Sequence, residues 1–148
     1  MLKRFGCLLA LCLIAAAPTW AEVEAIGYVK TVKGEAFVIG TGSRKAAEAG
    51  TPVYLNDVLS TGETGSLGVT FKDNSRISIG PDTELSVDTY IYAPRENKLG
   101  FVTKMSRGTL NFVSGTIAKL APDSVAVETP AGTIGVRGTH FLVKVEED

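Results

Sequence analysis

The sequence predicts an all-β fold, as a single domain built from many short strands. Apolar and polar residues alternate with a period of two through most of the chain, which is typical of strands with one buried face. Gly, Pro, Asn and Asp interrupt this alternation roughly every 8 to 12 residues. Only the segment 114–123 has the apolar spacing of a helical turn, and Pro122 ends it. The length of 148 residues fits one domain.

Residues 1–21 have the pattern of a secretory signal. Lys3 and Arg4 form a basic start, the apolar run Leu8–Ala17 follows, and small residues precede a cleavage site after Ala21. The apolar run is shorter than the ~20 residues that a membrane-spanning helix needs. We therefore expect a periplasmic or secreted domain of residues 22–148, with no membrane span once the signal is removed.

The mature chain is expected to lack cysteine and to be mildly acidic. Both cysteines, Cys7 and Cys12, lie inside the predicted signal, so no thiol, disulfide or lipid anchor should remain. The signal carries two basic residues and no acidic one, so its removal takes the net charge from −1 to about −3. No basic block is present, which argues against nucleic acid as a partner.

The first predicted strands after the signal are short. The alternation over 26–32 and 36–40 predicts a strand pair that turns at Lys33-Gly34. The polar segment 41–50 predicts a loop, and a short apolar stretch over 52–59 contains a turn at Asn56-Asp57.

The middle of the chain alternates most clearly. Strands are predicted at 67–71, 77–79 and 85–92, with turns at Asp73-Asn74 and Gly80-Pro81-Asp82. A polar hairpin tip at 95–98 leads to the segment 99–113, which we expect to form two strands broken at Arg107-Gly108.

Two architectures are compatible with these strands. The central strands have similar lengths, and we expect the turns between them to be too tight to join distant sheets, which favours a β-solenoid-like or rolled sheet. A β-sandwich, in which two sheets bring their apolar faces together, is the alternative.

The segment 125–143 is the most distinctive part of the chain. It predicts two short strands around a bend with three equally spaced glycines, Gly132, Gly135 and Gly138. Arg137 lies within this bend and Thr139 follows it. We interpret Arg137 as a structural lock that bonds nearby carbonyls or a carboxylate, with a contact to a partner as the alternative.

Residues that could carry chemistry are sparse. His140 is the only histidine, and no nucleophile and acid are placed beside it by the sequence. Asp57, Asp73, Asp82 and Asp88 do not follow the spacing of a calcium loop and are better explained as turn and strand-end residues. We therefore expect no catalytic, cofactor or metal site.

Tyrosines suggest one further kind of site. Tyr90 and Tyr92 share one face of a predicted strand. Core packing or cover of a sheet edge is the first interpretation, because aromatic residues are common in strands. A platform for stacking carbohydrate is the alternative.

Taken together, these segments resemble the FecR domain family over about residues 27 to 145. The resemblance rests on the run 56–62, on the alternating run 67–85 with Phe71, Asp73, Ser75, Pro81 and Thr83, and on Thr129-Pro130 followed by Gly135-Val136-Arg137-Gly138-Thr139-His140-Phe141-Leu142-Val143. It implies a periplasmic, all-β, non-enzymatic module without catalytic residues.

The functional expectation follows from this resemblance. The family's namesake passes a signal from an outer-membrane receptor to a cytoplasmic sigma factor, whereas the predicted signal at the start of this chain suggests a stand-alone secreted member. We expect a module that binds an envelope protein or glycan and takes part in signal sensing. A cell-wall or polysaccharide-binding module is the alternative, and a homo-oligomer formed through an open strand edge is also considered.

Overall fold

A computed structural model describes residues 16–17 and 23–146 of the chain. The predicted cleavage site and most of the predicted signal therefore lie outside the described residues. No helix in the described part is long and apolar enough to span a bilayer. The strands are β1 (Gly27–Lys33), β2 (Ala36–Gly40), β3 (Ser43–Ala46), β4 (Pro52–Val53), β5 (Val58–Thr61), β6 (Ser66–Phe71), β7 (Arg76–Ile79), β8 (Glu84–Ala93), β9 (Lys98–Val113), β10 (Val125–Thr129), β11 (Gly132–Gly135) and β12 (His140–Val145). The helix α1 is Thr116–Leu120, and single 3₁₀ turns lie at Pro94–Glu96 and Pro122–Ser124.

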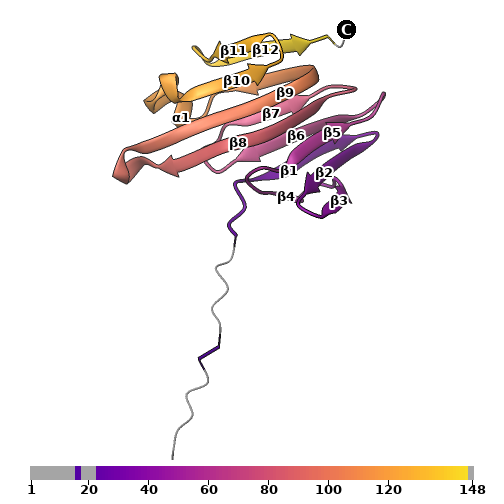
Figure 1. Ribbon diagram of the computed structural model, residues 1–148, viewed down its shortest axis with the longest axis horizontal. Helices are drawn as coiled ribbons and strands as arrows, with labels where there is room; N and C mark the ends of the chain where they lie inside the picture. Colours follow the sequence, from indigo (N-terminus) through magenta and orange to yellow (C-terminus); the bar gives the residue numbers. More distant parts are fainter. Residues whose placement is uncertain (1–15, 18–22, 147–148) are drawn as a thin grey trace, which may run out of the picture.

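All twelve strands in the described residues belong to one curled sheet, which confirms the prediction of an all-β domain with a rolled sheet (Figure 1). The main path of pairing is β3-β2-β5-β8-β9-β7-β6-β1-β4, and β10 and β12 add to the other edge of β9. One half of the sheet contains β1, β4, β6, β7 and β12, and the other half contains β2, β3, β5, β8, β10 and β11. The 16-residue strand β9 runs through both halves.

The chain crosses between the halves at bends instead of reversing there. The 98–107 part of β9 pairs with β8, whereas its 110–113 part pairs with β7. Strands β7 and β8 therefore follow one another along β9, and the turn at Gly80-Pro81-Asp82 connects the two halves of the sheet. This corrects the expectation that the turns are too tight to pass between sheets, since this turn bends the chain and leaves both strands paired with the same neighbour. The expected pairing of the strands around Lys33-Gly34 is also wrong, because β1 pairs with β4 and β6 whereas β2 pairs with β3 and β5 in the other half.

Threonine hydroxyls hold the sheet together where it bends. Thr83, which is fully buried, accepts a hydrogen bond from the Thr109 amide at 3.0 Å through its Oγ1. The Thr83 amide donates to Thr61 Oγ1 at 3.0 Å, and the Thr61 hydroxyl donates to the Gly80 carbonyl at 2.6 Å. These side chains replace the ladder hydrogen bonds that the bend interrupts, so few polar groups are left unpaired in the corner. We call Thr61, Thr83, Thr109 and Gly108 the threonine corner.

Gly108 permits the close approach at this corner. Its φ is +100°, and a Cβ built on it would lie 2.1 Å from Thr83 Oγ1 and 2.5 Å from Thr83 Cα. A residue with a side chain would therefore suffer both an unfavourable backbone conformation and a clash. Gly108 bends β9 without breaking it, which corrects the expectation of two separate strands over 99–113.

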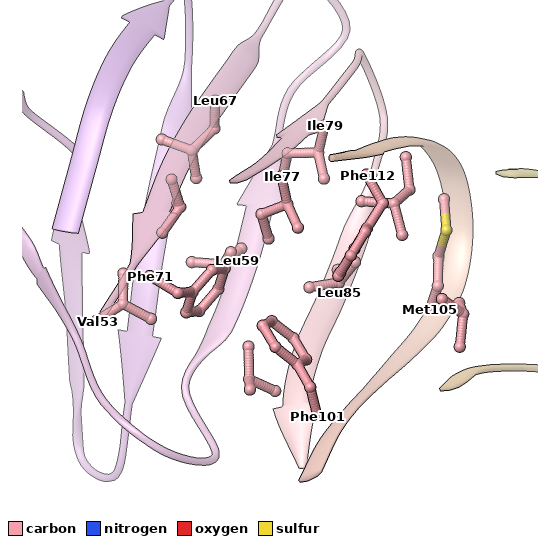
Figure 2. Close-up of a cluster of buried hydrophobic side chains, with 14 of the residues drawn as sticks. Val53, Leu59, Leu67, Phe71, Ile77, Ile79, Leu85, Phe101, Met105 and Phe112 are labelled. Carbon is pink, nitrogen blue, oxygen red and sulfur yellow. The ribbon is translucent and has the colours of Figure 1, made fainter. Parts of the chain in front are cut away.

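The bend packs the apolar faces of the two halves against each other. Phe101 lies in the part of β9 that pairs with β8, and Phe112 lies near the other end of β9. The centroid of the Phe101 ring is 4.8 Å from that of Phe71 in β6 and 5.4 Å from that of Phe112. Figure 2 shows these three rings among Leu and Ile side chains from both halves. One continuous core therefore spans the domain.

The short strands β3 and β11 were not predicted, because their sequences lack an alternating pattern. All four residues of β3, within the expected loop 41–50, are exposed, and Arg44 lies 4.1 Å above the Phe37 ring of β2. All four residues of β11 are exposed as well, and a two-residue turn pairs β11 with β10. The segment 125–143 therefore contains three strands and not two. Neither short strand buries a face, so neither carries the period-two signal.

We predict that Gly108→Ala destabilises the domain severely. The new methyl group would displace Thr83 and force a strained φ, and together these should cost about 3 kcal/mol or more of unfolding free energy. Gly42→Ala is the matched control, because Gly42 also has a positive φ (+73°) but nothing within 4 Å of an added Cβ. Chemical denaturation measures both. Equal losses in the two variants would contradict a packing role for Gly108.

Candidate functional site

The residues singled out from the sequence lie in two separate places. Gly135, Arg137, Gly138 and Thr139 belong to the end of β11 and the loop before β12, whereas Tyr90 and Tyr92 lie in β8. We call 136–139 the closing loop, because it joins β11 in one half of the sheet to β12 in the other. Segment 114–124, which contains α1, makes a similar connection from β9 to β10.

The closing loop is fastened from its inner side. Val136 is buried in the core, and its amide donates to the Val125 carbonyl at 3.3 Å. Ser114 donates from its amide to the Thr139 carbonyl at 2.8 Å and from its hydroxyl to the Gly138 carbonyl at 2.7 Å. Gly138 has a φ of +107°, a conformation that glycine adopts readily. The backbone of the loop is thus fixed without the help of Arg137.

Arg137 itself projects outward. Its side chain is 88% exposed and its guanidinium lies 3.7 Å from the carboxylate of Asp123, which is 90% exposed. Exposed ion pairs of this kind contribute about 0–1 kcal/mol. The inner contacts of Val136 and Ser114 therefore hold the bend, and the guanidinium stays accessible to other molecules.

A shallow groove of about 520 Å³ lies beside this guanidinium. Its walls come from the closing loop and from the segment around α1, including Ser114, Ala118, Lys119 and Asp123. Two cations and one carboxylate border the groove. The arrangement can bind an acidic or hydrogen-bonding group, and it contains no pairing of a nucleophile with a base.

Tyr90 is engaged by the core on one side and by a carboxylate on the other. Its ring lies 5.6 Å from the Phe71 ring and 5.1 Å from the Phe101 ring. Its hydroxyl donates to Asp73 Oδ1 at 2.9 Å and accepts from the Asp73 amide at 3.0 Å. Tyr92, two residues on, is 38% exposed. The two tyrosines share a face, but only Tyr92 offers a substantial exposed surface.

Asp73 is a fully buried carboxylate that organises this end of the fold. Besides the Tyr90 hydroxyl, it accepts hydrogen bonds from the Ser75 hydroxyl at 2.6 Å and from the Ile117 amide at 3.1 Å. Its carbonyl accepts from the Thr116 amide at 2.8 Å. Asp73 therefore ties the β6–β7 turn to β8 and to the start of α1, which in turn forms one wall of the groove.

The environment of Tyr90 keeps its phenol protonated. Burial and the neighbouring Asp73 carboxylate raise the pKa of Tyr90 well above its ordinary value of 10.0. The neutral hydroxyl can therefore donate to Asp73 throughout the physiological pH range. Its loss of a proton would place a second negative charge beside a buried carboxylate.

The other acidic residues and His140 have separate local partners. Asp57 accepts from the Tyr54 amide at 2.9 Å, and burial raises the pKa of the Asp57 carboxyl. Asp88 accepts from the Ser86 hydroxyl at 2.8 Å, and Asp82 lies in the Gly80–Asp82 bend with a positive φ. His140 contacts Asn111 of β9 through its Nε2. Within residues 16–17 and 23–146, no group of three or more His, Cys, Asp or Glu side chains could hold a metal ion.

Sequence reasoning missed the residues that build the site from within. Asp73 was interpreted only as a turn residue, although the spacing Asp73-Asn74-Ser75 is a signal for a side chain that bonds the backbone two residues on. Ser114 and Val136 stood out in no pattern, because their partners come from distant segments. Val136 could have been noticed as an apolar residue between glycines.

We predict that Tyr90→Phe lowers the unfolding free energy by roughly 1.5–3 kcal/mol at pH 7, because the variant loses a hydrogen bond to a carboxylate. The raised pKa adds a pH dependence. The folded wild-type protein holds the Tyr90 proton more tightly than the unfolded chain does, so the contribution of Tyr90 is present below about pH 10 and declines as the pH rises further.

Denaturation at pH 7 and at pH 11 measures both effects, and Tyr92→Phe serves as the control. The difference in unfolding free energy between wild type and Tyr90→Phe should be smaller at pH 11 than at pH 7. The unfolding free energy of Tyr92→Phe should stay within about 0.5 kcal/mol of wild type. Equal stability of Tyr90→Phe and wild type at pH 7 would show that the bond to Asp73 contributes nothing.

Comparison with known proteins gives one match. The family model described as FecR protein matches residues 57–148, from just before β5 through the closing loop and β12. The match is shorter than the resemblance noted from the sequence, because β1 to β4 lie outside it. No curated protein and no solved structure matches the chain. Because the family model covers more than half of the chain, this protein belongs to the FecR family, a regulatory family, and its membership suggests a signalling-related module.

Proposed function

We propose that this protein is a non-enzymatic, periplasmic or secreted module that binds an envelope protein through the groove beside Arg137 and takes part in signal sensing. Membership of the FecR family supports a role in signalling. The basic, apolar and small-residue pattern of residues 1–21 supports export.

The observation that carries this proposal is the presentation of Arg137 on a fixed loop. Val136 and Ser114 hold the backbone on both sides of it, while its side chain is 88% exposed. A side chain on a backbone that is already ordered loses less conformational entropy on binding than one on a mobile loop. Arginine is also enriched among the residues that dominate binding energy at protein interfaces.

Charge indicates what the partner should present. Arg137 and Lys119 border the groove, and Asp123 gives Arg137 only a weak, exposed ion pair. A carboxylate on the partner could replace Asp123 and form a better-aligned bidentate pair with the guanidinium. We therefore expect the partner to place an Asp or Glu side chain at this groove.

We predict that Arg137→Glu weakens binding of the envelope partner by at least about tenfold, since it replaces attraction by repulsion at the contact. The partner is captured from an envelope fraction by chemical cross-linking, purified, and titrated against each variant by calorimetry. Lys30→Glu is the control, because this substitution changes the charge by the same amount. Lys30 is an exposed residue of β1, which is separated from β12 by several strands in the sheet. Unchanged affinity in Arg137→Glu would refute this site.

A second candidate function is binding of cell-wall glycan. Tyr90 and Tyr92 line one groove of about 380 Å³ together with Lys72 and Glu24, a combination of rings and polar groups that suits a sugar. The engagement of Tyr90 by Phe71 and Asp73 leaves Tyr92 as the main stacking surface.

For this second candidate, Tyr92→Ala should abolish sedimentation of the protein with purified peptidoglycan, whereas Tyr28→Ala, which removes another exposed tyrosine from β1, should not. Sedimentation of Tyr92→Ala at the wild-type level would exclude glycan binding at this groove.

A further inference from the structure

The two ends of the sheet differ in how their edges are protected. At one end, β3 carries the exposed cations Arg44 and Lys45, and β4 contains Pro52. Charged residues and proline are features that keep edge strands from pairing with other chains. At the other end, β11 has the sequence Gly-Thr-Ile-Gly, without charge or proline, and all of its residues are exposed.

The free edge of β11 offers backbone groups for pairing. Strand β11 pairs with β10 alone among the described strands. The Val136 amide donates to Val125, and alternation along the antiparallel register then gives hydrogen-bonded pairs at Val127–Ile134 and Thr129–Gly132. The amides and carbonyls of Thr133 and Gly135 therefore point away from β10, toward the open edge.

A groove lies along this edge. Its volume is about 560 Å³, and it runs between the 129–134 segment and the end of β12 over 143–146. Ile134, an exposed apolar residue of β11 with 39% exposure, lines this groove. Open backbone groups beside exposed apolar side chains are the features that an added strand uses, the former for affinity and the latter for specificity.

The length and surroundings of β11 indicate whether a second copy of this chain or a strand of another protein would pair with its free edge. A two-fold pairing of β11 with the same strand of a second copy would engage only four residues of each chain, whereas stable interfaces bury ~1,200 Å² or more and use about 20–30 residues on each side. A longer strand from another protein can extend beyond Gly135 and reach Arg137, two residues on. An acidic residue at that position would find a cation.

We propose that β11 is a docking edge for an extended segment of a partner protein, which adds to the sheet as a strand beside β11 and places an acidic side chain at Arg137. The added strand pairs with the backbone of Thr133 and Gly135. The proposal rests on the proposed function at the Arg137 groove and specifies how that partner binds.

The probe is a displayed library of random ten-residue peptides, selected on the immobilised chain. Enriched peptides should contain β-branched or aromatic residues at alternate positions and an Asp or Glu near one end. Amide hydrogen exchange of the wild-type chain with the best peptide bound should slow at least about tenfold at Thr133 and Gly135. The Ile134 amide, which faces β10, should change little and acts as an internal control.

Two variants separate backbone pairing from side-chain contact. Thr133→Pro removes the outward amide, and proline is tolerated at such edge positions, so peptide affinity should fall at least tenfold. Thr133→Val retains the amide and should bind like wild type. Arg137→Glu should weaken only peptides that carry the acidic residue.

Several outcomes overturn strand addition. These are the recovery of no enriched peptide, unchanged exchange at Thr133 and Gly135, wild-type affinity in Thr133→Pro, or self-association of the chain with protection of the same amides. If Arg137→Glu loses binding of the envelope partner while Thr133→Pro binds it normally, the proposed function stands and strand addition fails. If neither variant loses binding, both proposals fail.

Discussion

The contact between Gly108 and Thr83 is the constraint on which the rest of the structure depends. It allows β9 to bend while the Thr83 hydroxyl accepts the Thr109 amide in place of a ladder bond. Because of this bend, one sheet supplies both layers of its own core, and Phe71, Phe101 and Phe112 come into contact. The bend also places β10 and β12, which pair with successive parts of β9, in different halves of the sheet, and the closing loop of the candidate site joins these halves.

The candidate site depends on the opposite end of the fold, where the two halves must be joined again. Asp73 links the β6–β7 turn to Tyr90 and to α1, and Ser114 links the end of β9 to the closing loop. These buried polar contacts leave Arg137 and the edge of β11 exposed on an ordered backbone. Such a surface suits recognition, because its binding groups are charged side chains and free backbone amides on a fixed frame.

The sequence predicted those parts of the fold in which strands bury one face. The alternation around Leu67–Phe71 and Ile77–Ile79 placed β6 and β7 closely, whereas the fully exposed β3 and β11 left no periodic signal. The turn at Gly80–Asp82 was expected to be too tight to join distant sheets, because a turn-forming sequence does not reveal which strands the turn connects. For the same reason Arg137 could be selected as exceptional, but the contacts of Ser114 and Asp73, which link segments distant in the chain, could not be foreseen.

Native-state hydrogen exchange at the threonine corner tests the central claim most directly. The amides of Thr83 and Thr109, which donate to the hydroxyls of Thr61 and Thr83, should exchange only when the whole domain unfolds. Their opening free energies should therefore equal the global unfolding free energy and fall with denaturant at the same slope. Exchange of these amides through local opening at a much smaller free energy would show that the fold does not depend on this corner.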